Sequence, residues 1–156
     1  MTRYRDRLPQ LSGDFFLTDA GMETDLIFNH GINIREFAAH TLLTEVAGRE
    51  AMARYFRHFL SLDLETQAGF ILDSQTWKAH MHWAEDLGAT EDELRHSNQN
   101  SVEFIAGLRD EFEKNTKPIV VVLAADDNHR LATEVERHVI TRSRNLVEVA
   151  GEAPLL

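Results

Sequence analysis

The sequence contains no cysteine among its 156 residues. This absence excludes disulfides, thiolate nucleophiles and every zinc site that needs sulfur ligands. No run approaches the roughly 18–20 apolar residues of a membrane-spanning helix, and the N-terminus lacks the apolar core of a signal peptide. We therefore expect a cytoplasmic protein that does not enter a membrane.

Basic residues are also scarce, with 16 Lys and Arg against 26 Asp and Glu and a formal net charge of -10. Lys and Arg neutralise the phosphates of nucleic acids and lipids, and here they are outnumbered by acidic residues. We therefore expect neither nucleic acid nor an anionic membrane as a partner. The sequence has no phosphate-binding loop, dinucleotide fingerprint or nucleophile elbow. Its 43% apolar and 27% charged content is typical of a soluble globular domain.

Three apolar segments, rich in aromatic or β-branched residues, have the pattern of buried strands. They are residues 15–19, 69–75 and 117–124. Three further segments have helical patterns or helix start and stop signals. They are residues 45–67, 76–88 and 90–114. Apolar strands that alternate with helices indicate an α/β fold with a parallel sheet covered by helices.

The predicted helices carry local signals of their own. The first helix has one apolar face, formed by Met52, Tyr55, Phe56 and Phe59. We expect Gly69 to stop this helix from just beyond its end. Thr90 and Glu93 fit a capping box, which predicts the start of the third helix.

The chain divides into three parts. Residues 1–14 form a lead-in, and residues 15–123 hold the alternating strands and helices. Residues 124–156 differ in character: they fit a helical tail, and no fourth strand is evident in them.

Asp19, Ala20 and Gly21 directly follow the first predicted strand. In open α/β sheets and α/β barrels, ligands bind at the C-terminal ends of the strands. A carboxylate there can hold an ammonium group by charge-assisted hydrogen bonds, and a glycine lets a ligand approach the backbone. The alternative, which the local sequence alone favours, is that Asp19 caps a helix or a turn.

Thr76 follows the second predicted strand and could bond the carboxylate of the same ligand, or else serve as the N-cap of the next helix. Trp77 and Trp83 could wall a pocket, although large aromatic residues more often pack in a core. His80 and His82 would point to roughly opposite sides of a helix, so we favour ordinary histidines over a metal site.

Three stretches together resemble the homocysteine S-methyltransferase family. They are LTDAGMETDLIFNHGINIREFAAHTLL (17–43), AGFILDSQTWKAHMHWAEDLG (68–88) and KPIVVV (117–122). The resemblance covers roughly residues 15–123 and rests on a D-G-G-like turn, a T-W-x-A segment and their separation. It implies the N-terminal portion of a homocysteine-binding (β/α)8 barrel, a fold of TIM type.

The resemblance also implies a substrate and a reaction. Asp19 matches the family aspartate that holds the homocysteine amino group, and Thr76 matches the threonine near the substrate carboxylate. Ala20 and Gly21 match the small residues whose backbone lies beside the substrate, although the family usually has Gly at the position of Ala20. The family reaction transfers a methyl group from a donor such as S-methylmethionine or betaine to homocysteine, giving methionine.

The family activates homocysteine with a zinc ion held by three cysteines from the later half of the barrel. This chain has no cysteine, so we expect it to bind no zinc by itself. A closed barrel takes about 250 residues, so 156 residues predict a truncated one. Three hypotheses follow: a shortened methyltransferase, a non-catalytic module that binds an amino acid or forms homo-oligomers through its open edges, and a truncated or frame-shifted product.

Overall fold

The computed structural model describes residues 7–114 and 118–122. The strands and helices follow in the order β1 (Leu17–Thr18), α1 (Met22–Phe28), α2 (Val46–Thr66), β2 (Phe70–Asp73), α3 (Ala84–Leu87), α4 (Glu91–Phe112) and β3 (Ile119–Val122), with two helices between successive strands. Short 3₁₀ turns lie at Pro9–Leu11, Arg35–Phe37, Ala39–Thr44 and Met81–Trp83. The protein is therefore a mixed α/β protein that is mostly helical, with one small sheet.

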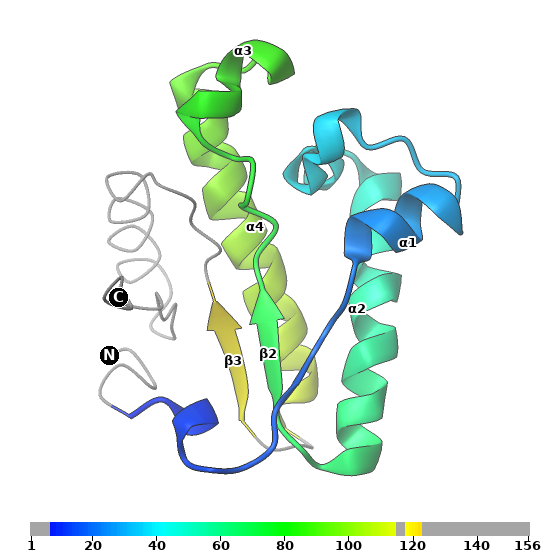
Figure 1. Ribbon diagram of the computed structural model, residues 1–156, viewed down its shortest axis with the longest axis vertical. Coiled ribbons are helices and arrows are strands. Elements are labelled where there is room, and N and C mark those ends of the chain that lie inside the picture. The colour runs from blue at the N-terminus through cyan, green and yellow to red at the C-terminus, as the bar shows by residue number, and fades with distance from the viewer. Residues whose placement is uncertain (1–6, 115–117, 123–156) are drawn as a thin grey trace, which may run out of the picture.

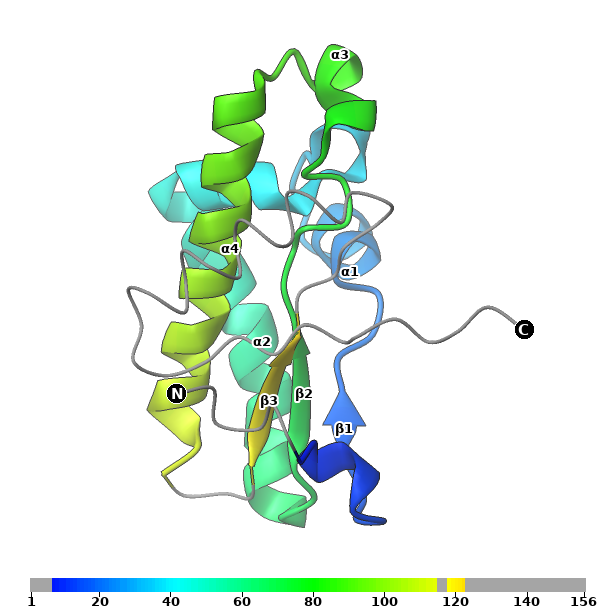
Figure 2. The same ribbon diagram turned by 90° about the vertical axis from the view of Figure 1, so that its left-hand side faces the viewer.

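The three strands form a parallel sheet in the order β1-β2-β3, as Figure 1 shows. Thr18 pairs with Ile71 of β2, and Asp73 at the end of β2 pairs with Val122. Helices α2 and α4 pack on one face of the sheet (Figure 2). The segments that follow β1 and β2 gather at the C-terminal end of the strands, where α1 and α3 lie (Figure 1). The predicted parallel sheet and its helical cover are confirmed.

The core lies between the sheet and these two helices. Phe70 and Leu72 of β2 are fully buried, and they pack in one cluster with Phe56 and Leu60 of α2 and Ile105 of α4. The predicted apolar face of α2 is confirmed, since its residues are buried or, in one case, partly buried. Burial of each large apolar side chain contributes about 1.5–3 kcal/mol to folding, so this cluster is the main source of stability.

The start of α4 is the predicted capping box. The Glu93 N–H donates to the Thr90 hydroxyl at 3.3 Å, and the Thr90 N–H donates to a Glu93 carboxylate oxygen at 2.7 Å. Two backbone N–H groups of the first turn, which have no partner within a helix, are thereby bonded.

The end of α2 differs in detail from the prediction. The helix is capped by Gln67 in the left-handed conformation (φ 53°), two residues before Gly69. Gly69 itself has φ 97°, and a Cβ atom there would lie 2.8 Å from the Phe16 ring. Its N–H donates to the buried Asp63 carboxylate at 2.8 Å, which ties the helix end to the start of β2. Gly69 thus permits a close approach of two segments and does not end the helix.

The first two strands are shorter than predicted. β1 holds only two residues, and Phe15, predicted to be buried in it, is 87% exposed. β2 ends at Asp73. An aromatic-rich run favours a strand, but only the residues that pair with a neighbouring strand become one, and β1 pairs at two positions.

Residues 76–80 are not helical, so the predicted helix over residues 76–88 is wrong in its first part. The Ala79 N–H donates to the Thr76 carbonyl at 2.9 Å, which closes a turn, and His80 has extended backbone (φ -142°). The cause is tertiary: Lys78 is buried and its ammonium donates to the Glu36 carbonyl at 2.6 Å. Helical structure begins only at Met81–Trp83 and continues in α3.

The predicted helical tail over residues 124–156 lies outside the described residues, as do residues 117, 123 and 124 of the third predicted strand. Within residues 7–114 and 118–122, no helix has the length and apolar character that a bilayer crossing requires.

Candidate functional site

The C-terminal ends of β1 and β2 bring two carboxylates to one edge of the sheet. Asp19 directly follows Thr18, which pairs with Ile71, and Asp73 lies two residues beyond Ile71. Because the two strands are parallel neighbours, both carboxylates lie at the edge where ligands bind in α/β folds. We call Asp19, Ala20 and Asp73 the strand-end site.

Negative charge is disfavoured at this strand-end site. Burial raises the pKa of Asp19 above its ordinary value of 3.8, and the nearby charges of Asp73 and Glu23 raise it further, against a hydrogen bond from Tyr55 that lowers it. Burial also raises the pKa of Asp73. Two adjacent carboxylates with raised pKa values form a place where a bound cation is electrostatically favoured.

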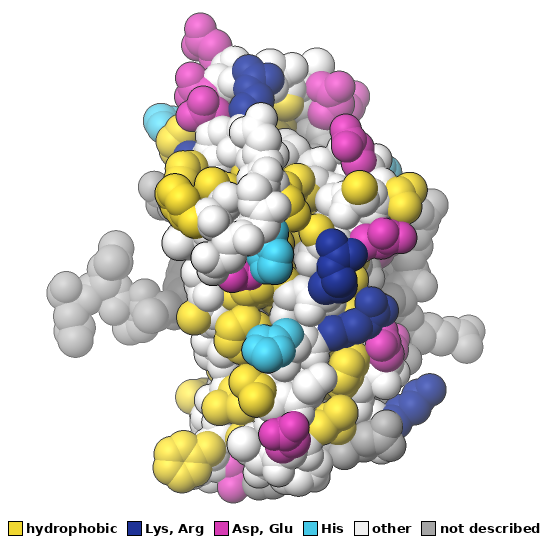
Figure 3. All heavy atoms as spheres, turned by 90° about the vertical axis from the view of Figure 1, so that its right-hand side faces the viewer, with side chains coloured by type: hydrophobic (Ala, Val, Ile, Leu, Met, Phe, Trp, Pro, Cys, Tyr) yellow, Lys and Arg dark blue, Asp and Glu magenta, His cyan; other side chains and the backbone are white. Residues whose placement is uncertain are grey.

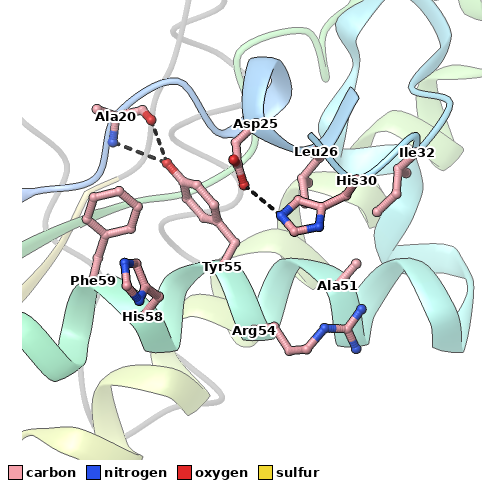
Figure 4. A pocket seen from close by; sticks show the side chains of 10 residues that line it. All are labelled: Ala20, Asp25, Leu26, His30, Ile32, Ala51, Arg54, Tyr55, His58 and Phe59. Atoms are coloured by element: carbon pink, nitrogen blue, oxygen red, sulfur yellow. Dashed lines mark hydrogen bonds and ion pairs between the residues drawn. The ribbon is translucent and has the colours of Figure 1, made fainter. Parts of the chain in front are cut away.

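A tyrosine from α2 fixes the turn after β1. The Tyr55 hydroxyl lies 2.8 Å from the Ala20 carbonyl oxygen and 3.2 Å from a carboxylate oxygen of Asp19, and it can donate its proton to either. It also accepts the Ala20 N–H at 3.2 Å (Figure 4). Burial raises the pKa of Tyr55 well above 10.0, so this hydroxyl keeps its proton at neutral pH.

Tyr55 is the residue of this site that sequence reasoning missed. Its spacing placed it correctly on the buried face of α2. A buried tyrosine hydroxyl needs a hydrogen-bond partner, so the pattern indicated that a polar contact exists. The partners lie 35 and 36 residues earlier in the chain, and no local pattern identifies them.

Asp19 is not the cap of α1, so the helix-cap alternative is wrong. Gly21 occupies the N-cap position with φ 63°, in the left-handed region that favours glycine, and no side chain caps this helix. Ala20, beside Asp19, is exposed. The predicted trio therefore forms one turn that follows β1 and precedes α1.

Thr76 lies three residues beyond the end of β2, in the segment that follows the strand. It is 3% exposed, and its hydroxyl lies 2.9 Å from that of Ser74. It is not a helix N-cap, because residues 76–80 form a turn and extended backbone. Thr76 is therefore a buried residue of the segment that follows β2.

The two tryptophans flank a lysine. The Lys78 ammonium lies 3.7 Å from the centroid of the Trp83 ring and 5.1 Å from that of Trp77. Cations are attracted to aromatic ring faces at such distances. The rings of His80 and His82 stack with their centroids 6.0 Å apart, and the His82 N–H donates to His80 Nδ1 at 3.3 Å.

The zinc site of the resembled family does not fit the residues of this chain. The chain supplies no cysteine. Among the residues that the structure describes, no three His, Asp or Glu side chains lie together in a way that could hold a metal ion. No step that uses zinc is therefore assigned to this chain.

Comparisons with known proteins do not place this chain in a family. No family model matches it, and neither curated proteins nor solved structures give a match.

Proposed function

We propose that the strand-end site binds the ammonium group of a small amino acid of homocysteine type. The observation that supports this most directly is the pair of carboxylates of Asp19 and Asp73 at one sheet edge, each with a raised pKa. An ammonium group would balance their negative charge and donate hydrogen bonds to them. Ala20, the next residue along the chain, is exposed and small, so it leaves room for a ligand beside Asp19.

We further propose that the chain is related to the N-terminal portion of the homocysteine S-methyltransferase family and forms part of a (β/α)8 barrel. Two features support this proposal: the parallel order β1-β2-β3 and the packing of α2 and α4 on one face of the sheet. Successive βα units of such a barrel have this order, with the helices on the outer face. The sequence resemblance, over residues 15–123, covers the same part of the chain as the elements from β1 to β3.

The proposal is binding rather than methyl transfer by this chain alone. The family reaction needs a thiolate generated on zinc, and the ligands for that zinc are not among the residues of this chain. Methyl transfer from S-methylmethionine or betaine would need them from another polypeptide. A non-catalytic module that binds an amino acid is the function that the residues present support.

Calorimetric titration of the chain with reduced L-homocysteine tests the proposal. Asp19→Asn keeps the shape of the side chain and removes its charge, and we expect it to weaken binding by about 1.5–3 kcal/mol, or about ten- to a hundredfold. The matched control is Asp14→Asn, the same change at an exposed residue before β1. We expect this control to bind like the unaltered chain.

A second comparison isolates the ammonium group. The ligand 4-mercaptobutyrate has the thiol and the carboxylate of homocysteine without its amino group. We expect it to bind far more weakly than homocysteine. Equal affinity for the two ligands, or an unchanged affinity in Asp19→Asn, would remove the strand-end site as an ammonium site.

A further inference from the structure

A concave site lies between α1 and α2. It is a cavity of about 500 Å³, which is within the range of small-molecule sites. Its apolar lining comprises Leu26 and Ile32 on one side and Ala51 and Phe59 of α2 on the other. Figure 3 shows this face of the molecule, with basic side chains and histidines standing around apolar surface.

An aspartate and an arginine line the cavity, and they differ in what they contact. The Asp25 carboxylate of α1 accepts a hydrogen bond from Asn29 at 2.8 Å and lies 3.2 Å from His30 Nε2, so both its oxygens are engaged. Arg54 of α2 has no hydrogen bond or ion pair with any residue in the described part of the chain. Of the two charges, that of Arg54 is the one left for a ligand.

Figure 4 shows how these side chains lie around the cavity. Asp25 and His30 come from the upper wall, and Arg54 and His58 come from α2 below, with Tyr55 between them. Arg54 and His58 lie one turn apart on α2, and both line the cavity. The guanidinium is planar and matches a carboxylate in a bidentate pair.

We propose that this cavity binds a small amphipathic carboxylate. Its apolar body would lie against Leu26, Ile32 and Phe59, and its carboxylate would pair with the Arg54 guanidinium. An uncharged ligand would leave Arg54 unpaired, and an inorganic anion would leave the apolar walls exposed to water. In a chain with a net charge of -10, an unpaired arginine beside an apolar cavity is the feature that selects for an anion.

This site is distinct from the strand-end site, although the two share a wall. Tyr55 and Ala20 line the cavity, whereas Asp19 does not. Binding of a carboxylate here does not depend on an ammonium at Asp19. The two proposals can therefore fail separately, and Asp19→Asn should leave the cavity ligand bound.

The test is a titration of the ¹⁵N-labelled full chain with 3-phenylpropionate, followed by amide chemical shifts. We expect saturable shifts at the residues that line the cavity. Arg54→Gln should weaken the affinity by about five- to tenfold, the loss expected for one partly exposed charged hydrogen-bonded pair. The absence of saturable shifts at the cavity would overturn the proposal.

The matched control is Arg57→Gln, which makes the same charge change one turn along the same helix. Arg57 does not line the cavity and pairs with Glu111 at 2.9 Å across the groove between α2 and α4. We expect its affinity to stay within about twofold, because exposed charges outside the contact are screened. Equal weakening in Arg54→Gln and Arg57→Gln would show non-specific attraction and refute the site.

Two further ligands separate the charge from the apolar body. The neutral amide 3-phenylpropanamide should bind the unaltered chain more weakly than the acid does. To Arg54→Gln, the amide and the acid should bind with about equal affinity. Inorganic phosphate should give no cavity shifts at the same concentration. An amide that binds as well as the acid, or phosphate that binds as well as the acid, would contradict the assignment of an amphipathic carboxylate.

Discussion

Replacement of Tyr55 by Phe tests whether this hydroxyl holds the turn after β1. The change removes one oxygen and keeps the ring, which packs against Phe56 and Phe59 with centroids 5.3 Å and 5.0 Å away. The hydroxyl donates one hydrogen bond, to Ala20 or Asp19, and accepts one from the Ala20 N–H. A typical hydrogen bond contributes about 0.5–1.5 kcal/mol, and water can partly replace these two at the exposed Ala20. We therefore expect Tyr55→Phe to lower the free energy of unfolding by about 1–2 kcal/mol.

Urea denaturation at pH 7, followed by circular dichroism, measures this loss. A double-mutant cycle with Asp19→Ala then apportions the part that belongs to the contact between Tyr55 and Asp19, for which we expect a coupling of at least about 0.5 kcal/mol. Tyr55→Phe should also weaken homocysteine binding, because the Asp19 carboxylate loses the hydroxyl that orients it. A loss below about 0.3 kcal/mol together with zero coupling would refute the idea that Tyr55 positions the site.

Three further predictions concern stability. Burial lowers the pKa of His40 from 6.5 to about 4, so its contribution to the free energy of unfolding is present above pH 6.5 and is lost as the pH falls towards 4. In urea titrations at a series of pH values, His40→Leu should show a smaller loss of stability over this range. Parallel stability curves for the two proteins would contradict the prediction. Thr90→Ala should cost about 1 kcal/mol by loss of the cap, whereas Thr90→Ser should not, as thermal unfolding would show. Because folding raises the pKa of Asp19 above 3.8, the contribution of this residue to the free energy of unfolding is present at acid pH and is lost as the pH rises. Asp19→Asn should therefore be more stable than the unaltered chain at pH 7, and the difference should disappear near pH 3.

The periodicity of the sequence was sufficient to predict the type of each long element. The buried face of α2 and the capping box at Thr90 are both local signals, set by residues within one or two turns of each other. The adjacency of the first two strand ends also followed from sequence, since parallel strands place their C-terminal ends at one edge. This is why Asp19 was placed at the same edge as the end of β2.

The parts that sequence reasoning missed depend on contacts between distant residues. Residues 76–80 carry no strong helix breaker, yet the chain there is held by the contact of Lys78 with the Glu36 carbonyl, 42 positions earlier. Phe15 belongs to an aromatic run, but it lies outside the two-residue pairing of β1 and stays exposed. The hydroxyl of Tyr55 likewise has partners that only the fold brings near.

The energetics of the strand-end site argue that its carboxylates are not there for folding. Asp19 and Asp73 both have raised pKa values, so their charges at neutral pH weigh against the folded state. Tyr55 holds the Asp19 side chain in this unfavourable place and fixes the backbone of Ala20 beside it. A group whose charge opposes folding, and which a buried side chain nevertheless orients, is characteristic of a binding site. The proposed ammonium ligand would reverse the sign of this effect, because it would stabilise the charged carboxylates that burial disfavours. Ligand binding and the pH dependence of stability should therefore be coupled through Asp19.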